Sequence, residues 1–387
     1  MPAPRSWDVF CRVVDNFGDA AVCWRLAQRL AAGGDAPTRL WIDNLSVLHA
    51  LRPELEIDLA RQTLAGVEIC HWVADADFGR PADVAVDAFG GGLPDDYAEA
   101  MAARSPKTLW VVLEYLSAES WVASHHGLPS PHPSLALDRY FFFPGFSPGT
   151  GGLLRELDLP ERRTAFLTHP FRARELWRNA GFPLPERGAT LISLFGYENA
   201  AVAELLEAWI AGTEPVVAAI PQSRLSSRAA ALFGLSAVPA GKAIRRGGLE
   251  ARFMPFLAQE RYDELLWAAN WNFVRGEDSF VRAQWAERPL VWHVYPQAGR
   301  AHVAKLDAFL EAYCSGLPEG AKNPLRRLWR GWNHASDAPQ GSLGGAWREL
   351  SGQESVFCEH AHAWAQKLAT AGDLASNLAK FCADRLK

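Results

Sequence analysis

The sequence lacks several features that identify common classes of protein. Its six cysteines form no CxxC pair and lie mostly in apolar segments, which is typical of reduced core thiols rather than of a disulfide framework. No stretch approaches the ~18 uninterrupted apolar residues of a membrane span. The first residues, MPAPRSWD, contain no hydrophobic region of a signal peptide. We therefore expect a soluble, cytoplasmic protein that has no membrane partner.

The sequence also lacks an excess of positive charge. Its formal net charge is −5, and the acidic residues are spread along the chain. General nucleic-acid binders carry a basic face, so we expect no nucleic-acid partner, whereas a basic protein is a suitable one. The absence of a basic helical run also disfavours an enzyme that works on a membrane surface.

Several short motifs of nucleotide and covalent chemistry are missing as well. The chain has no Walker sequence, no GxGxxG after its first expected strand and no GxSxG. NAD-dependent chemistry and nucleophilic serine catalysis are therefore disfavoured. Asp75 and Asp77 form a DxD, and His125, His126 and His132 lie in a proline-rich loop. Neither group has further ligands at metal spacing, so we expect no metal.

What the sequence does contain is a repeated alternation of strand and helix. Apolar runs of strand length are separated by helical or polar stretches, which is the pattern of a parallel, doubly wound α/β sheet. The expected strands are 9–14, 39–43, 67–72, 83–89, 108–113 and 139–146 in the first half, and 190–195, 216–220, 251–256, 271–274 and 290–294 in the second.

A chain of 387 residues is too long for one ordinary core and suits two domains. We predict a Rossmann-like domain over 1–175 and a second one over 185–355, because the polar segment 171–187 carries Pro183 and Pro185. The segment 356–387 is expected to form one helix, from about 359 to 385. Its apolar stripe is expected to pack at the interdomain interface.

A loop with two carboxylates joins the first strand to the first helix. Asp15 and Asp19 stand four residues apart across a turn that contains Gly18. Loops at the carboxyl ends of strands form the ligand sites of open α/β sheets. One carboxylate suits a general base and the other would orient it or cap the helix. Two ordinary turn and cap residues explain the pattern more simply, so both interpretations stay open.

A second loop of this kind follows a short apolar strand in the second half. Gly276 provides the turn, and Asp278 or Ser279 is suited to N-cap the next helix. Backbone N–H groups at a helix start bind phosphate oxygens, and Arg275 and Ser279 would add donors. Glu277 and Asp278 would repel a diphosphate and better accept hydrogen bonds from sugar hydroxyls or base donors. A capped helix whose acids favour its own N-terminus is the alternative.

Aromatic residues stand at the ends of two further strands of the second half. Phe256 and Gln259 suit stacking on a pyrimidine and hydrogen bonding to it, and Phe195 and Tyr197 suit the opposite wall. Core packing is the competing explanation, because aromatic residues are common in cores. Their placement at the carboxyl ends of strands favours a ligand site.

Four stretches taken together resemble one family of enzymes. DVFCRVVDNFGDAAVCWRLA, SLFGYEN, RFMPFLAQERYDELLW and NFVRGEDSFVRAQWA are similar, in order and over nearly the whole chain, to the protein-arginine rhamnosyltransferases of elongation factor P. The resemblance implies a GT-B glycosyltransferase fold, in which two Rossmann-like domains face each other across a cleft. It also implies an inverting enzyme that needs no metal and no cofactor. The implied reaction moves rhamnose from the nucleotide sugar TDP-β-L-rhamnose to an arginine in the N-terminal domain of elongation factor P, which activates that protein.

The same resemblance implies roles for individual residues. Asp19 matches the general-base aspartate, and Asp15 matches the second aspartate of the opening motif. The other matches lie on the donor side, around thymine, ribose and diphosphate: Phe195, Tyr197, Phe253, Phe256, Gln259, Arg275, Glu277, Asp278 and Ser279. A GT-B glycosyltransferase with a lipid or saccharide acceptor is the alternative.

Overall fold

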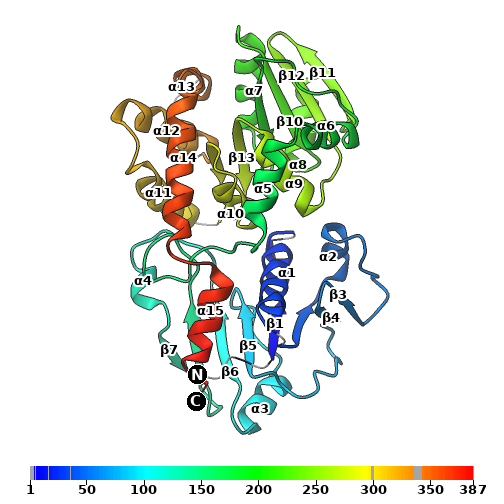
Figure 1. Ribbon diagram of the computed structural model, residues 1–387, viewed down its shortest axis with the longest axis vertical. Helices are drawn as coiled ribbons and strands as arrows, with labels where there is room; N and C mark the ends of the chain where they lie inside the picture. Colours follow the sequence, from blue (N-terminus) through cyan, green and yellow to red (C-terminus); the bar gives the residue numbers. More distant parts are fainter. Residues whose placement is uncertain are drawn as a thin grey trace. The chain divides into compact units, whose positions relative to one another are not determined.

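The computed structural model describes residues 4, 6–15, 17–34, 36–297, 300–334 and 342–386. The chain divides into two compact units (Figure 1). Unit 1 comprises Met1–Leu157 together with Leu368–Lys387, and unit 2 comprises Asp158–Lys367. Each unit contains its own mainly parallel sheet, which agrees with the alternating pattern of the sequence.

In the described residues, the sheet of unit 1 has eight strands in the order β3-β4-β2-β1-β5-β6-β8-β7. Its pairs are parallel except for the antiparallel pairs at the two edges, β3 with β4 and β7 with β8. The strands are β1 (Trp7–Cys11), β2 (Thr38–Ile42), β3 (Arg61–Leu64), β4 (Val67–His71), β5 (Val84–Ala88), β6 (Leu109–Leu113), β7 (Pro129–Pro131) and β8 (Asp138–Phe142). The helices of this unit are α1 (Phe17–Ala32), α2 (Leu45–Leu51), α3 (Asp95–Ala103), α4 (Val122–His125) and α15 (Leu374–Ala383).

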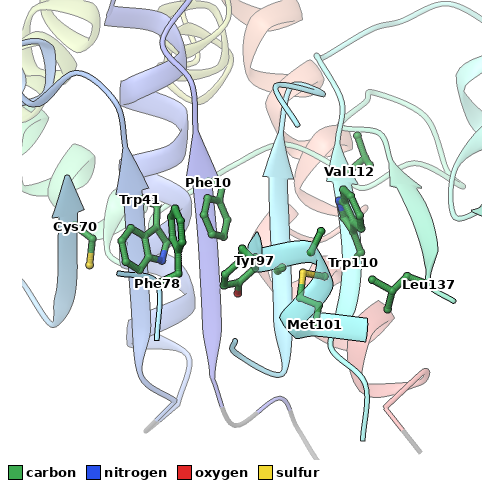
Figure 2. Packing of buried hydrophobic residues seen from close by; sticks show 11 residues of the cluster. Phe10, Trp41, Cys70, Phe78, Tyr97, Met101, Trp110, Val112 and Leu137 are labelled. Carbon is green, nitrogen blue, oxygen red and sulfur yellow. The ribbon is translucent and has the colours of Figure 1, made fainter. Parts of the chain in front are cut away.

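Alternate residues of these strands build an aromatic core on one face of the sheet. Phe10, Trp41 and Cys70 share one level, because Phe10 is in register with Trp41 and Trp41 with Cys70. Tyr97 and Met101 of α3 close this face, and Figure 2 shows both residues directed at the strands. Figure 2 also shows α1 behind the sheet, on the opposite face. Helices on both faces explain why the strands read as continuous apolar runs.

In the part of the chain that the structure describes, unit 2 has a six-stranded sheet in the order β11-β12-β10-β9-β13-β14, in which only β11 runs antiparallel to its neighbour. The strands are β9 (Thr190–Leu194), β10 (Val216–Pro221), β11 (Lys242–Arg246), β12 (Leu249–Met254), β13 (Trp271–Arg275) and β14 (Leu290–His293). The helices are α5 (Leu159–Thr168), α6 (Pro170–Asn179), α7 (Ala201–Ala211), α8 (Arg224–Leu232), α9 (Gln259–Ala268), α10 (Asp278–Trp285), α11 (Ala301–Cys314), α12 (Glu319–Trp332), α13 (Ser342–Ser351) and α14 (Glu354–Ala369).

Each strand expected from the sequence is present, and the edge strands β3, β7 and β11 were not expected. These three are short or polar and largely exposed, so they leave no apolar run in the sequence. The opening strand is shorter than expected, because it ends at Cys11 and Val14 is 69% exposed. The backbone N–H of Val13 bonds to the carboxylate of Asp43 and that of Val14 to the carboxylate of Asp19, so neither bonds to a neighbouring strand.

The division between the units lies at Leu157 and Asp158 rather than in the predicted segment 171–187. That polar segment is mostly the amphipathic helix α6, which buries Leu176 and Trp177 and packs with α9 of unit 2. The prolines that suggested a linker lie between α6 and β9, inside unit 2.

The single terminal helix expected over 359–385 is instead two helices, α14 and α15. Gly372 has a φ of +79°, which breaks the helix, and Asp373 caps α15 by accepting bonds from the N–H groups of Ala375 and Ser376. Asp373 also accepts a bond from Arg29 Nη2 at 3.0 Å, and α15 lies beside α1 in unit 1 (Figure 1). The residues of the predicted apolar stripe therefore pack in two separate cores, Trp364 against Tyr313 and Phe381 against Phe142. A place for it at the interdomain interface stays a prediction.

One buried carboxylate joins several segments of unit 1. Asp8 of β1 is 0% exposed. It accepts hydrogen bonds from Arg39 Nε at 2.5 Å and Nη2 at 2.6 Å, from the Tyr97 hydroxyl at 2.5 Å, from Ala82 N at 3.0 Å and from Trp41 Nε1 at 3.3 Å. These partners come from β2, α3 and the segment before β5. Charge-assisted bonds of this number compensate the desolvation of the carboxylate.

The substitution Asp8→Asn is expected to destabilise unit 1 by about 3–5 kcal/mol, because it leaves the Arg39 guanidinium without its counter-charge and turns amide hydrogens toward donors. Urea unfolding followed by tryptophan fluorescence measures the loss. The control Glu68→Gln breaks a partly exposed pair with Arg61 and should cost less than ~1 kcal/mol. A loss for Asp8→Asn no larger than that of the control would contradict the assignment.

Candidate active site

The predicted site residues follow the strands at which each sheet changes its direction of growth. In unit 1, β2 and β4 lie on one side of β1, and β5 and β6 lie on the other. In unit 2, β10 and β12 lie on one side of β9, and β13 and β14 lie on the other. At such points the loops after adjacent strands turn to opposite faces and leave room for a ligand.

Asp19 lies in the first turn of α1 rather than on the preceding loop, because the helix begins at Phe17. The side chain is 2% exposed. Its Oδ2 accepts hydrogen bonds from the backbone N–H groups of Val14 and Asp15, both at 2.8 Å. In the described residues, its Oδ1 has one hydrogen-bond partner, the Tyr115 hydroxyl at 3.4 Å. One oxygen thus closes the turn, and the other carries a single long bond.

The environment of Asp19 raises the pKa of its carboxyl group. Burial is the largest cause, and the neighbouring carboxylate of Asp43 acts in the same direction. The backbone bonds from Asp15 and Val14 and the Tyr115 hydroxyl oppose the rise. The carboxylate is consequently a stronger base than an exposed aspartate.

Asp15 stands two residues before the start of this helix and is half-buried. Its backbone C=O accepts a bond from the N–H of Gly18 at 2.7 Å. A Cβ at Gly18 would lie 2.7 Å from Asp15 Oδ2, which is closer than real Cβ contacts, so a side chain at this position would displace the Asp15 carboxylate. Asp15 and Asp19 are thus brought to one turn, as the spacing predicted.

In unit 2, the loop after β13 is closed by its own side chains. Gly276 has a φ of +56°, which confirms the predicted turn. Ser279 Oγ accepts a bond from Arg275 N at 2.9 Å and donates one to Arg275 O at 2.5 Å. Glu277 occupies the N-cap position of α10 without a side-chain cap bond. The predicted cap by Asp278 or Ser279 is therefore wrong, since both residues lie inside the first turn.

The acids of this loop differ in their surroundings. Asp278 accepts a bond from Arg282 Nε at 2.9 Å, and Arg282 also pairs with Asp263 at 2.9 Å. This network fixes the start of α10 on α9. Donor binding by Glu277, Asp278 and Ser279 stays a prediction.

Three predicted residues gather at the ends of β9 and β13. The Arg275 guanidinium lies over the ring of Phe195 at 4.5 Å and over that of Tyr197 at 4.9 Å. Such cation–π contacts hold a planar cation in place while its edge remains a hydrogen-bond donor. A cation of fixed direction suits the recognition of an anionic group.

Phe256 lies between β12 and α9, and Gln259 is the first residue of α9. Phe256 is 38% exposed, so part of its ring is accessible to a ligand. Gln259 is 6% exposed, and its Nε2 has no hydrogen-bond partner among the described residues. A buried amide hydrogen without a partner is costly, and a ligand acceptor would satisfy it. Phe253, by contrast, lies fully buried in β12 near Phe233, so its ring supports the core.

The sequence interpretation did not include several residues that line these loops. Tyr262 packs edge-on to Phe195 at 5.6 Å, and His293 packs edge-on to Tyr197 at 5.3 Å. Burial, the largest cause, lowers the pKa of His293 to about 3, so its ring is neutral. Tyr115 and Asp43 of unit 1 were missed too. Asp43 ends the expected strand 39–43, and Tyr115 stands two residues after the expected strand 108–113, which was the available signal.

The described residues also lack two kinds of feature. In the described ranges, no group of three or more His, Cys, Asp or Glu side chains is arranged to hold a metal ion. Over the same residues, no helix has the length and apolar character needed to cross a membrane.

Comparison with known proteins identifies the family. Residues 7–383 match the family described as Elongation-Factor P (EF-P) rhamnosyltransferase EarP. Proteins named protein-arginine rhamnosyltransferase from Pseudomonas putida and Pseudomonas aeruginosa are 43% and 42% identical, over 97% and 98% of this chain and 98% and 100% of their own lengths.

Solved structures agree with this match. The structure of EarP-mediated arginine glycosylation of translation elongation factor EF-P superposes with a TM-score of 0.69 at 32% identity, covering 98% of this chain and 99% of that chain. The kitacinnamycin glycosyltransferase superposes with a TM-score of 0.53 at 13% identity, over the whole of both chains, and supports the GT-B fold alone. The chain is a GT-B glycosyltransferase that belongs to the EarP family of protein-arginine rhamnosyltransferases.

Proposed function

We propose that this protein transfers rhamnose from TDP-β-L-rhamnose to an arginine side chain of elongation factor P in the cytoplasm, with inversion at the sugar carbon and without a metal or cofactor. The names of its relatives support the rhamnosyl group and the protein-arginine acceptor. The alternative of a lipid or saccharide acceptor has no such support. The observation that carries the proposal is the buried Asp19 carboxylate, whose Oδ1 has one long hydrogen bond in the described residues.

The acceptor explains why a strong base is needed. A guanidinium has a pKa above ~12 and delocalised lone pairs, so it is a poor nucleophile. Oδ1 of Asp19 accepts a hydrogen bond from the cation and then takes a proton as the nitrogen attacks the anomeric carbon. The new C–N bond forms as the C–O bond to the diphosphate breaks, and TDP leaves with that electron pair. Attack from the face opposite the diphosphate inverts the carbon.

The donor side stabilises the leaving group. Charge develops on the β-phosphate of TDP, and the Arg275 guanidinium with the N-terminus of α10 would stabilise it. Phe256 would stack on thymine, and the free amide hydrogens of Gln259 would bond to a carbonyl of the base. Phe195 and Tyr197 hold Arg275 in place, which the ring contacts support.

The substitution Asp19→Asn is expected to lower the transfer rate at least ~100-fold, because an amide takes no proton. Intact-mass analysis of elongation factor P, after incubation with TDP-rhamnose, measures the gain of one deoxyhexose. The matched control is Asp75→Asn, an exposed acid of the DxD in the same unit, which should keep full activity with a chelator present. An unmodified acceptor with the wild-type protein would refute the proposed function.

The rate should depend on the ionised form of Asp19. Burial raises the pKa of Asp19 above the ordinary value of 3.8. The reaction should therefore run at full rate above the raised pKa, and the rate should fall as pH decreases through it. We expect an acidic limb of kcat/KM that lies above the range of an exposed aspartate. Single-turnover rates at saturating donor do not depend on donor affinity, so they show whether this acidic limb belongs to the chemical step rather than to donor binding. A profile that stays flat down to the ordinary pKa would contradict the role of Asp19 as base.

The substitution Arg275→Lys is expected to raise the donor KM by about tenfold or more, since lysine keeps the charge but loses the planar fork and the stacking. Steady-state kinetics and calorimetry with TDP measure the effect. Arg245→Lys, on the exposed face of β11, is the matched control and should leave both values unchanged. Equal effects of the two substitutions would contradict a role for Arg275 in donor binding.

A further inference from the structure

Tyr115 is the only described residue that places a side-chain donor on the open oxygen of Asp19. Its hydroxyl lies 3.4 Å from Oδ1, whereas Oδ2 is already engaged by two backbone N–H groups. We propose that Tyr115 is a positioning residue for this reaction, whose hydroxyl directs Oδ1 of Asp19 toward the acceptor nitrogen. The inference rests on the proposed role of Asp19 as the base.

The position of the hydroxyl is set by contacts among residues that follow three neighbouring strands. Tyr115 follows the end of β6, and its ring stacks on Phe89 with centroids 4.4 Å apart and planes at 15°. Phe89 follows the end of β5 and has a φ of +60°, which is uncommon for a residue other than glycine. Its backbone N–H donates to Leu113 O at 2.6 Å, which ties the ends of β5 and β6 together. Asp19 follows β1, so the loops after three neighbouring strands converge on one carboxylate.

A strained backbone beside a stacked pair indicates a position that the surrounding structure specifies strongly. The ring of Tyr115 would remain packed without its hydroxyl, so packing alone does not account for the tyrosine. The hydroxyl adds a donor beside a carboxylate that must be ionised before the reaction. It stabilises that ionised form and fixes which oxygen lone pair faces outward.

The charged groups around Asp19 disfavour its ionised form, and the Tyr115 hydroxyl opposes this effect. Asp43, after β2, raises the pKa of Asp19, and its Oδ1 accepts a bond from Val13 N at 3.0 Å. Asp15 contributes a backbone N–H to Oδ2 and a second carboxylate in the same turn. Two acids therefore stand near the base, and Tyr115 is the side-chain donor that opposes them. Its removal should make Asp19 easier to protonate.

The test is Tyr115→Phe, which removes the hydroxyl and keeps the ring. We expect the acidic limb of the rate profile to move to higher pH. At acid pH kcat should fall on the order of fivefold, about 1 kcal/mol, with recovery toward the wild-type value at neutral pH. The KM for TDP-rhamnose should not change, because the donor residues lie in unit 2. A general loss of structure would instead lower the rate equally at every pH.

Two further variants make the result specific. Tyr97→Phe removes the other tyrosine that donates to a buried aspartate of unit 1, Asp8, and should lower stability without moving the acidic limb. Phe89→Leu leaves a non-glycine residue at the position with positive φ and removes only the aromatic ring that stacks on Tyr115. It should move the limb in the same direction as Tyr115→Phe, by a smaller amount.

The outcomes separate the inference from the function on which it rests. An active wild-type protein, with a Tyr115→Phe limb that coincides with that of the wild type, would overturn the role of Tyr115 and leave the proposed function intact. The same limb shift in Tyr97→Phe would also overturn it, because the effect would then be one of stability. Failure of the wild-type protein to modify elongation factor P would instead refute the proposed function.

Discussion

The reversal of strand order beside β1 and beside β9 is the constraint on which the candidate residues of each unit depend. The chain leaves each central strand toward one edge of the sheet and later returns to the other edge. Neighbouring loops therefore diverge at that strand, and the space between them can hold a ligand. Asp19 in unit 1 and the Phe195–Arg275 group in unit 2 both stand at such points. Other loops on these sheets carry polar residues too, but they lack this divergence.

Two buried aspartates of unit 1 show how the same side chain serves stability or chemistry. Asp8 is surrounded by donors on both oxygens, and its partners come from β2, α3 and the segment before β5. Asp19 has two strong bonds on one oxygen and a single long one on the other. A fully satisfied carboxylate holds the structure together but is a poor base. A partly satisfied one retains a lone pair for a substrate proton.

Much of this could be predicted from particular residues. The runs 67–72 and 108–113 predicted strands because parallel strands covered on both faces are continuously apolar. The edge strands were missed because Pro129–Pro131 and Lys242–Arg246 are largely exposed and carry no such pattern. The terminal helix was predicted too long, since its apolar spacing continues from Trp364 to Phe381 across Gly372 and Asp373. Only its packing shows that Trp364 meets Tyr313 while Phe381 meets Phe142.

The sequence by itself determined the class of fold, the family and the carboxylates of the opening turn, because these depend on local periodicity and on motifs that are contiguous in the chain. The tertiary structure alone decided that Asp19 belongs to α1, that Oδ1 rather than Oδ2 carries the open lone pair, and that Phe253 lies in the core. It also decided that Tyr115 and Phe89 stand beside the base. These properties depend on hydrogen bonds and ring contacts between segments as far apart as 96 residues, which no local pattern encodes.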